Sequence, residues 1–318
     1  MNKTPCIYCA STQHSFCYST HDTRQVPYNL HRCNDCGTYF LCPYPTDEDL
    51  AWAYSDAYYG NQTNKFDNDT ERVVDMFRQY RAAWVAKRVA KNAKILDIGC
   101  GNGRFLHFLA QKGNFEGHGI ELPGKSADRA AQLDNINLHI GALQPDTIAP
   151  QSFDAVTLVH VYEHLPNPRQ TLETLQKIIK PGGKLFIYLP NIDSFQSRWF
   201  KGLWLHLDPP RHLFLQAPAD LIRHCRSYGF EIAEKQFFNP EYNPFGMQQS
   251  LLNMVYAKRE LLYEHLKGNQ QYTANYAAWH LIWQKWFFRL TFPLFIATDF
   301  IAALFGKSAT FVFVFEKK

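Results

Sequence analysis

The sequence lacks several features that would assign it quickly to a class of proteins. Its first residues, MNKTPCIYCA, contain no apolar run of the kind that forms a secretory signal. No stretch reaches about 18 uncharged apolar residues, so we expect no membrane-spanning helix. We find no internal repeat and no low-complexity segment. These absences predict a globular, cytoplasmic protein.

Charge of one sign is also scarce. The 318 residues include 33 basic and 29 acidic side chains, which gives a formal net charge of +4. Because polyanion-binding proteins usually carry a strong basic excess, this balance argues against a nucleic-acid partner. The hydrophobic fraction of 46% is enough for a folded core, so intrinsic disorder is excluded as well.

Cysteine is present in a specific pattern near the N-terminus. Two Cys-x-x-Cys pairs, Cys6/Cys9 and Cys33/Cys36, account for four of the eight cysteines. In a chain without a secretory signal, such pairs favour metal binding over disulfides. Four thiolates form a closed tetrahedral zinc site, so we expect structural zinc in a ribbon-like module spanning 1–45.

Alternatives to this ligand set remain open. Histidines lie between the two pairs, so one of them could replace a cysteine: His14, His21 or His31. The remaining cysteines are interpreted as small buried or spare thiols, namely Cys17, Cys42, Cys100 and Cys225.

From residue 94 onward, short apolar runs alternate with amphipathic stretches. KILDIG, FEGHGIEL, INLHIGA, FDAVTLVHV and KLFIYLPN predict strands, while GRFLHFLAQKG, GKSADRAAQL and NPRQTLETLQKIIKPGG predict helices. The alternation predicts an α/β fold with a doubly wound, mostly parallel sheet. The closing stretch SATFVFVFEKK is apolar on both faces, so it should lie inside the sheet.

The segments outside this alternation predict further parts of the chain. Residues 46–93 are expected to form a helical linker, with a periodic helix over 71–91. The core is expected to comprise 94–240 and 309–318. Residues 241–308 form an aromatic, mostly helical insert.

Within the insert, the aromatic stretch 275–305 allows three interpretations. Pro293 should split it into two helices, and Arg289 and Asp299 interrupt its apolar character. It could be a cap over an acceptor pocket or a dimer face. It could also be an interfacial helical pair in peripheral contact with the inner face of a membrane.

The stretch ILDIGCGNGR, residues 95–104, reads as a strand followed by a glycine-rich turn. A dinucleotide fingerprint would place its third glycine at position 104, which is occupied by Arg104. Here the glycines alternate instead, at Gly99, Gly101 and Gly103. Three alternating glycines indicate that the backbone must approach a ligand closely, whereas a plain turn would need only one.

Two acidic residues near this turn indicate what kind of ligand it binds. Asp97 lies inside the apolar strand, where its carboxylate could order the loop amides or face a cationic ligand. It would repel a pyrophosphate, so the ligand should carry an ammonium or sulfonium group. Glu121 ends the second strand, where a carboxylate can accept hydrogen bonds from ribose hydroxyls, unless it is merely a solvated loop acid.

Together, Asp97, the glycine triplet and Glu121 resemble the S-adenosylmethionine site of class I methyltransferases. FDAVTLVHVYEHLPNP (153–168) and IIKPGGKLFIYLPN (178–191) resemble the motifs of the fourth and fifth strands of that family. The resemblance implies a Rossmann-like sheet with a final antiparallel strand, an S-adenosylmethionine cofactor and methyl transfer.

One position departs from the family pattern. An acidic residue often binds the adenine amino group after the third strand, but Ala142 occupies that place and Asp146 lies further along. Backbone groups near Leu143 are therefore expected to contact the adenine. His160, at the end of strand four, is expected to line the cofactor pocket.

Candidate general bases should follow strands four and five, where open α/β sheets bind their ligands. His160 and His164 follow strand four, and histidine titrates near neutral pH. His164 could instead only tie its loop to backbone groups. The loop DPPRHLF (208–214) offers His212 as a third base. In the same loop, Arg211 would either bind an anionic acceptor group or form a salt bridge within the loop.

The acceptor is the least determined part of the prediction. The zinc knuckle before a methyltransferase core resembles a bacterial group in which some members methylate a carbon of nucleotide-linked sugars. We expect C- or O-methylation of a small-molecule acceptor, which could be sugar-linked or lipid-linked. The alternatives are an RNA methyltransferase and a non-catalytic cofactor-binding protein that recruits a partner. The sequence does not specify an oligomeric state.

Overall fold

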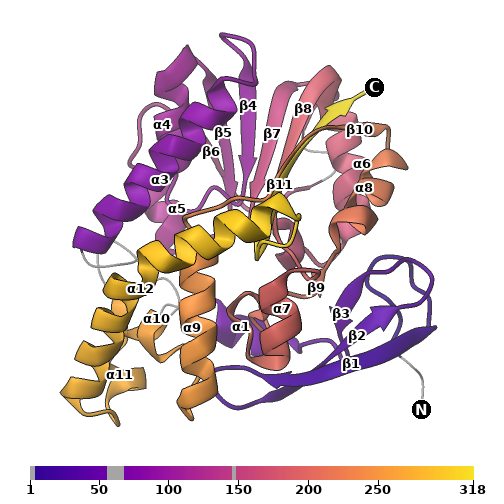
Figure 1. Cartoon of the computed structure of the whole chain (residues 1–318). Helices are drawn as coiled ribbons and strands as arrows, with labels where there is room; N and C mark the ends of the chain where they lie inside the picture. The colour runs from indigo at the N-terminus through magenta and orange to yellow at the C-terminus, as the bar shows by residue number, and fades with distance from the viewer. Residues whose placement is uncertain (1–3, 56–67, 145–147) are drawn as a thin grey trace. The chain divides into compact units, whose positions relative to one another are not determined.

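The computed structural model describes residues 4–55, 68–144 and 148–318 (Figure 1). The chain divides into two compact units, which are described separately below. The seven-stranded unit contains residues 68–189, 221–235 and 312–318. The four-stranded unit contains residues 1–67, 190–220 and 236–311. The predicted linker segment 56–67 and Asp146 lie outside the described residues.

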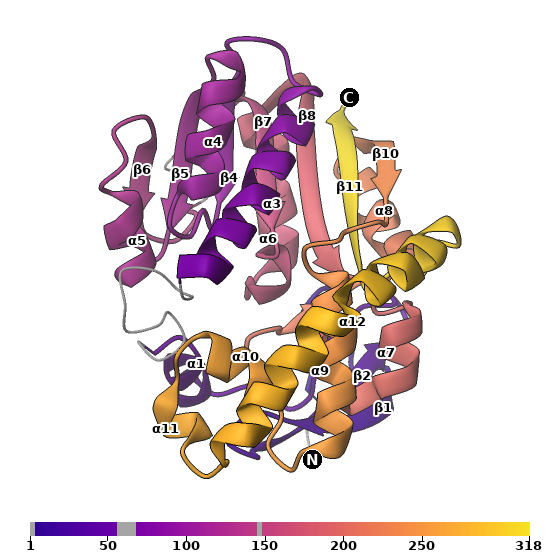
Figure 2. The same cartoon turned by 60° about the vertical axis from the view of Figure 1, so that its left-hand side comes forward.

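The seven-stranded sheet has the order β10-β11-β8-β7-β4-β5-β6. Its central pairs, β4 with β5 and β7, β5 with β6, and β7 with β8, are parallel. Figure 2 shows β11 running opposite to β8 and β10, between which it lies. The strands are β4 (Lys94–Ile98), β5 (Glu116–Glu121), β6 (Asn137–Ile140), β7 (Phe153–Val159), β8 (Ile179–Pro190), β10 (Phe230–Gln236) and β11 (Thr310–Lys317). The predicted fold class, with its final antiparallel strand, is confirmed.

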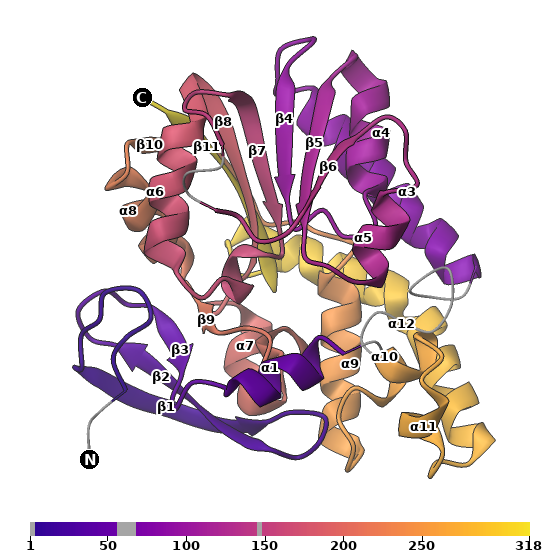
Figure 3. The same cartoon turned by 180° about the vertical axis from the view of Figure 1, so that it is seen from behind.

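Helices cover both faces of this sheet. Figures 1 and 3 show α3 and α4 against one face and α6 and α8 against the other. The helices of the unit are α3 (Asn68–Ala86), α4 (Arg104–Gly113), α5 (Lys125–Ala130), α6 (Pro168–Ile178) and α8 (Pro218–Arg226), with a short 3-10 turn η1 (Tyr162–His164). Pro168 opens α6, a position where the missing N–H of proline has no helical partner in any case.

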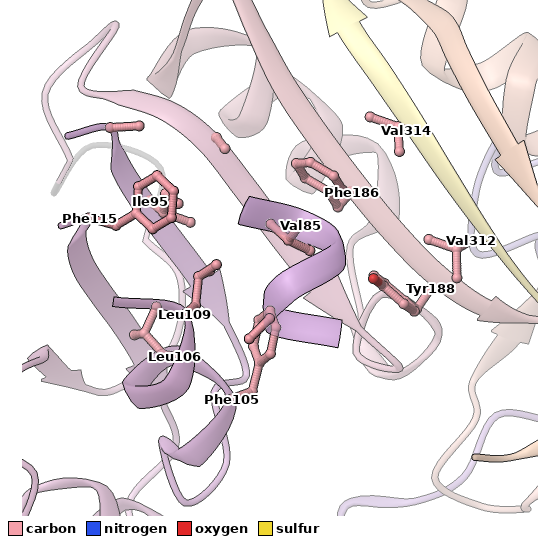
Figure 4. Close-up of a cluster of buried hydrophobic side chains, with 13 residues drawn as sticks. Val85, Ile95, Phe105, Leu106, Leu109, Phe115, Phe186, Tyr188, Val312 and Val314 are labelled. Atoms are coloured by element: carbon pink, nitrogen blue, oxygen red, sulfur yellow. The ribbon is translucent and has the colours of Figure 1, made fainter. Parts of the chain in front are cut away.

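The core between α3, α4 and the sheet consists of apolar side chains from distant parts of the sequence. Figure 4 shows Val85 of α3, Phe105 of α4 and Phe186 of β8 in one cluster. Val312 of β11 joins them and is only 4% exposed. Burial of such side chains stabilises the fold by about 1.5–3 kcal/mol each. This packing fixes the strands whose ends form the site.

The four-stranded unit contains a sheet with the order β1-β2-β3-β9. All three pairings are antiparallel. The strands are β1 (His14–His21), β2 (Pro27–Cys33), β3 (Tyr39–Leu41) and β9 (Phe214–Leu215). Our sequence analysis did not predict these strands, because their alternation is weak and a bulge between Phe16 and Tyr18 interrupts it.

Most helices of this unit belong to the aromatic insert. The helices are α1 (Asp47–Ala53), α7 (Phe195–Phe200), α9 (Asn243–Val255), α10 (Leu261–Leu266), α11 (Gln270–Thr273) and α12 (Ala278–Leu304), with the 3-10 turns η2 (Lys201–Leu203) and η3 (Leu205–Leu207). Helix α1 begins with a capping box, in which Thr46 and Asp49 bond to each other's backbone amides.

The prediction that Pro293 splits the aromatic stretch was wrong, because α12 continues through this residue. Gln248 of α9 donates to the Phe288 carbonyl at 2.8 Å and to the Thr291 hydroxyl at 2.7 Å. Thr291 in turn donates to the Phe287 carbonyl at 2.7 Å. These bonds hold the turn before Pro293, where the proline ring disturbs the helical hydrogen-bond pattern.

Candidate functional site

The ends of three parallel strands meet at one edge of the seven-stranded sheet. Ile98 of β4 pairs with Ile120 of β5 on one side and with Leu158 of β7 on the other. The residues that follow each strand therefore emerge at the same level. They are the glycine turn after β4, Glu121 at the end of β5 and His160 after β7. This edge is where open α/β sheets bind their ligands.

The three glycines of the turn adopt left-handed conformations for different reasons. Their φ angles are 69° at Gly99, 59° at Gly101 and 72° at Gly103. A Cβ atom on Gly99 would lie 2.5 Å from the Cγ2 atom of Val161, and one on Gly103 would lie 2.8 Å from the Cδ1 atom of Ile136. A Cβ on Gly101 would meet no atom of the described residues within 4 Å. Gly101 thus borders open space that a ligand can occupy.

Glu121 organises the backbone of this turn. Its Oε2 atom accepts a hydrogen bond from the Gly101 amide at 2.7 Å. The amides of Gly99 and Cys100 donate to the Ile120 carbonyl at 2.8 and 3.1 Å. Burial raises the pKa of Glu121, while the Gly101 amide acts in the opposite direction. Glu121, and not Asp97, accepts from the Gly101 amide.

Asp97 is a buried carboxylate beneath the turn. Its side chain accepts a hydrogen bond from the Thr157 hydroxyl at 2.6 Å, across the register pair of β4 and β7. Burial raises the pKa of Asp97 to about 7, although Thr157 and the positive charge of Arg81 act to lower it. Near neutral pH this carboxyl group is therefore partly protonated, and a nearby cation would favour its ionised form.

His160 occupies an unusual backbone position directly after β7. Its φ angle is 54°, and its amide donates to the Tyr188 carbonyl of β8 at 3.1 Å. The Nδ1 atom lies 3.6 Å from Oε1 of Glu163, whose side chain is fully buried. A non-glycine residue in this conformation costs about 1–3 kcal/mol, a cost often found at functional sites.

The neighbouring candidates have less distinctive surroundings. His164 ends the turn η1, is partly exposed, and donates its amide to the Val161 carbonyl at 3.0 Å. Leu143 is partly buried in the segment after β6, which begins where the Gly141 amide donates to the Glu121 carbonyl at 2.8 Å.

His212 belongs to the four-stranded unit, in the loop 208–214. It is buried, its Nδ1 atom lies 2.9 Å from the His206 carbonyl, and its Nε2 atom lies 3.8 Å from Oδ2 of Asp208. Arg211 forms two hydrogen bonds with the same Asp208 carboxylate, one of them at 2.9 Å from its Nε atom. Of the two roles expected for Arg211, the salt bridge within the loop is therefore present.

The four predicted zinc ligands lie together in the four-stranded unit. Their Sγ atoms all lie within 4.8 Å of one another. The Cys6 and Cys36 sulfurs are 3.6 Å apart, and those of Cys9 and Cys33 are 3.5 Å apart. Tetrahedral zinc with bonds of about 2.3 Å requires sulfur separations of about 3.8 Å. The arrangement therefore fits one zinc ion.

The two cysteine pairs also share one backbone conformation. The Cys6 carbonyl accepts from the Ala10 amide at 2.8 Å, and the Cys33 carbonyl accepts from the Gly37 amide at 3.1 Å. Ala10 and Gly37 both have positive φ angles, 60° and 77°. Each pair therefore forms the same tight turn, which directs two sulfurs to one side.

Helix α12 has an inverted distribution of polar and apolar residues. Large apolar residues recur along its solvent-facing side at helical spacing and are 49–72% exposed: Trp279, Trp283, Trp286, Leu290, Leu294, Ile301 and Leu304. Its buried residues are Gln284 and Asp299. The Asp299 carboxylate accepts from the Asn243 side chain of α9 at 3.1 Å. A surface helix normally shows the opposite arrangement.

Helix α12 is also long and apolar enough to cross a membrane by length and composition. This differs from our expectation of no spanning helix. We expected Pro293 and the charged residues to interrupt the apolar stretch, but the helix continues through Pro293 and contains an apolar window with few charges. A single helix of this kind is weak evidence for a span.

Comparisons with known proteins agree with this geometry. The methyltransferase domain family matches residues 71–235. The chain therefore belongs to this family, and it is an S-adenosylmethionine-dependent methyltransferase. The ubiquinone biosynthesis O-methyltransferase of Azoarcus sp. is 31% identical over 168 residues, which cover 48% of this chain and 69% of the relative.

Two further comparisons are with a curated protein and with a solved structure. The ubiquinone biosynthesis O-methyltransferase of Pseudomonas aeruginosa is 28% identical over 57% of this chain and 84% of its own length. The solved geranyl diphosphate C-methyltransferase of Streptomyces coelicolor is 10% identical, with a TM-score of 0.46 over 75% of this chain and 79% of that one.

Two residues of the site region were not singled out as site residues from the sequence. Thr157 bonds to Asp97, and Glu163 lies beside His160. Thr157 is a polar residue in an apolar strand. The sequence alone does not show that it pairs with Asp97, because this depends on the register of β4 with β7. Glu163 stands three residues after His160, and this spacing was the available signal that the carboxylate and the imidazole lie close together.

Proposed function

We propose that this chain methylates a hydroxyl group of a small, lipid-linked acceptor at a membrane surface. The hydroxyl is favoured because the relatives with about 30% identity are named O-methyltransferases. The lipid linkage is favoured by the exposed apolar side of α12. We assign the core to 94–240 and 309–318, the insert to 241–308, and the module and linker to 1–45 and 46–93.

The cofactor is assigned to the edge of the sheet where the glycine turn lies. The observation that carries this proposal is the hydrogen bond between Glu121 and the Gly101 amide, beside open space above Gly101. The Glu121 carboxylate would also accept hydrogen bonds from ribose hydroxyls, and backbone groups at Leu143 would contact the adenine. The assigned residues are Asp97, Gly99, Gly101, Gly103, Glu121, Leu143 and His160.

S-adenosylmethionine would supply an activated methyl group on a sulfonium centre. Transfer of that methyl group to an acceptor oxygen would leave S-adenosylhomocysteine, and the hydroxyl would have to give up its proton to a base of this chain. We assign His160 as the base that takes this proton, with Glu163 orienting the imidazole and stabilising its charged form. His164 and His212 are the alternative bases.

We also propose that Cys6, Cys9, Cys33 and Cys36 hold one structural zinc ion. The support is the convergence of four sulfurs from two similar turns. Because all four positions of a tetrahedral ion would be filled by thiolates, this zinc has a structural role and takes no part in methyl transfer.

The membrane is proposed as the partner of α12, through residues 275–305. Its buried side bonds to α9 through Gln248 and Asn243, so the helix is expected to lie in the interface plane and not across the bilayer. Its charged residues other than the buried Asp299 are basic, Lys285 and Arg289, which suits an anionic lipid surface.

The most direct test uses a cofactor with a carbon-13 methyl group and extracts from cells, separated into membrane lipids, soluble small molecules and RNA. We expect the label in the lipid fraction, and the carbon shift of a methoxy group in the product. A C-methyl shift would replace O-methylation, label in a soluble sugar would contradict the lipid linkage, and label in RNA would contradict a small-molecule acceptor.

The pKa of Asp97 predicts how cofactor binding depends on pH. At pH 6 the carboxyl is mostly protonated, so binding a sulfonium next to it requires loss of a proton; at pH 8 it is already ionised. The affinity for S-adenosylmethionine should therefore rise about tenfold between these pH values. Calorimetry should show this increase in the wild type and a flat profile in Asp97→Asn, which keeps an oxygen for Thr157.

Glu121→Gln is the matched control for Asp97→Asn. Loss of its charge should weaken binding by about 1–3 kcal/mol, because it bonds to an amide and to ribose hydroxyls in every protonation state of Asp97. The rise with pH should remain, with its midpoint at lower pH, because the charge of Glu121 contributes to the raised pKa of Asp97. If Asp97→Asn keeps the wild-type slope, Asp97 is not the group that titrates.

A base at His160 predicts a loss of turnover that is much larger than the loss of cofactor affinity. With the acceptor found in the labelling experiment, His160→Asn should lower kcat by about 10²–10⁴-fold. Binding of S-adenosylhomocysteine should weaken by a much smaller factor, because His160 lines the cofactor pocket but supplies only one of its contacts. His139→Asn, on exposed β6, is the control. A comparable loss in His164→Asn or His212→Asn, with His160→Asn active, would assign the base to that histidine.

The apolar side of α12 predicts binding to lipid vesicles. The wild type should float with vesicles of phosphatidylcholine and phosphatidylglycerol, and less with phosphatidylcholine alone. Trp286→Glu and Leu290→Glu change exposed side chains, so each should weaken vesicle binding about tenfold or more while leaving cofactor binding intact.

Met76→Glu is the control, because Met76 is 65% exposed on α3. It should leave vesicle binding unchanged. Light scattering should be recorded in parallel for all proteins. A wild-type dimer that becomes monomeric in Leu290→Glu, without vesicle binding, would assign the apolar side to a second copy of the chain.

A further inference from the structure

The four-stranded sheet carries a second group of metal-binding side chains. His14 on β1, His31 on β2 and Cys42 directly after β3 each offer one ligand atom. These three atoms lie within 4.8 Å of one another, and none of the residues belongs to the group of four cysteines. Neither methyl transfer nor the structural zinc requires this group.

The strand register explains why the three side chains converge. His14 pairs with Cys33, and the Cys42 amide donates to the Asn29 carbonyl at 2.9 Å, which continues the ladder between β2 and β3. Because side chains alternate along a strand, Asn29, His31 and Cys33 of β2 project to one face. Their cross-strand neighbours His14 and Cys42 project to the same face. Two strands and the residue directly after a third strand therefore position the three ligands.

The two imidazoles lie in direct contact. The Nδ1 atoms of His14 and His31 are 2.9 Å apart. The Nε2 atom of His14 is buried and has no hydrogen-bond partner within the described residues. A neutral imidazole has one donor and one acceptor nitrogen, so this contact satisfies only one nitrogen of each ring. An ion among the rings would accept a lone pair from each.

We propose that His14, His31 and Cys42 together bind a divalent transition-metal ion, with Zn²⁺ as the first candidate. Two imidazoles and a thiolate suit zinc and similar ions, whereas calcium and magnesium prefer oxygen ligands. Three protein ligands leave one position of a tetrahedral ion for water or an exogenous ligand. All three residues are partly exposed, so solvent can reach that position.

Metal analysis of the full chain tests this proposal. The wild type should retain two equivalents of zinc after dialysis, and Cys42→Ser and His31→Asn should each retain one. Cys33→Ser should lose the ion of the four cysteines. His21→Asn is the matched control, because His21 lies on β1 outside the group and should retain both equivalents.

Cobalt substitution assigns each ion to its ligands. Bands from thiolate-to-cobalt charge transfer grow with the number of thiolates, so the four-cysteine ion gives the strong absorption and this ion the weak one. Cys42→Ser should remove only the weak component, and Cys33→Ser most of the strong one. Circular dichroism checks that each variant folds, and Cys42→Ser alone suffices if His31→Asn does not fold.

The results separate this proposal from the structural zinc. If the wild type retains one equivalent of zinc and Cys42→Ser retains the same amount, the site of His14, His31 and Cys42 is overturned and the four-cysteine site is left intact. The contact between His14 and His31 would then be an ordinary hydrogen bond. No zinc in the wild type, together with no cobalt bands, would overturn both.

Discussion

The parallel register of β4 with β5 and β7 is the constraint on which the proposed cofactor site depends. It brings Ile98, Ile120 and Leu158 to the same level, so three chain segments leave the sheet together. The turn after β4 must then pass close to Val161 of the turn after β7, and a Cβ on Gly99 would clash there. The glycine at position 99 is thus required by the strand register itself.

The same register explains why the two acidic residues differ. Asp97 lies inside β4, where its carboxylate accepts from the Thr157 hydroxyl, and burial raises its pKa to about 7. Glu121 lies at the strand end, where it accepts from the Gly101 amide and remains partly exposed. One carboxylate is therefore sensitive to a neighbouring cation, and the other fixes the conformation of the loop.

The sequence predicted the parts of the fold that depend on local periodicity and on residue identity. The structure contains the predicted alternation of strands and helices after residue 94, and it contains the buried strand β11. Both could be predicted because a strand that is apolar on both faces is stable only inside a sheet covered on both sides. Strands β1–β3 and β9 were missed, since their pairing depends on distant partners such as Phe40 and Phe214. Which oxygen bonds to which amide, as for Glu121, also requires three-dimensional register.

Helix α12 shows why a proline rule can fail. Pro293 removes one helical hydrogen bond, but Gln248 of the neighbouring helix bonds to the preceding turn, and Asp299 bonds to Asn243 on the same side. These buried polar contacts fix the orientation of the helix at little gain in stability, since burying polar groups offsets most of the energy of their hydrogen bonds. With its polar side committed to α9, the helix must present Trp286 and Leu290 outward. The exposed apolar side is therefore built into the packing, and a covering lipid surface would lower its free energy.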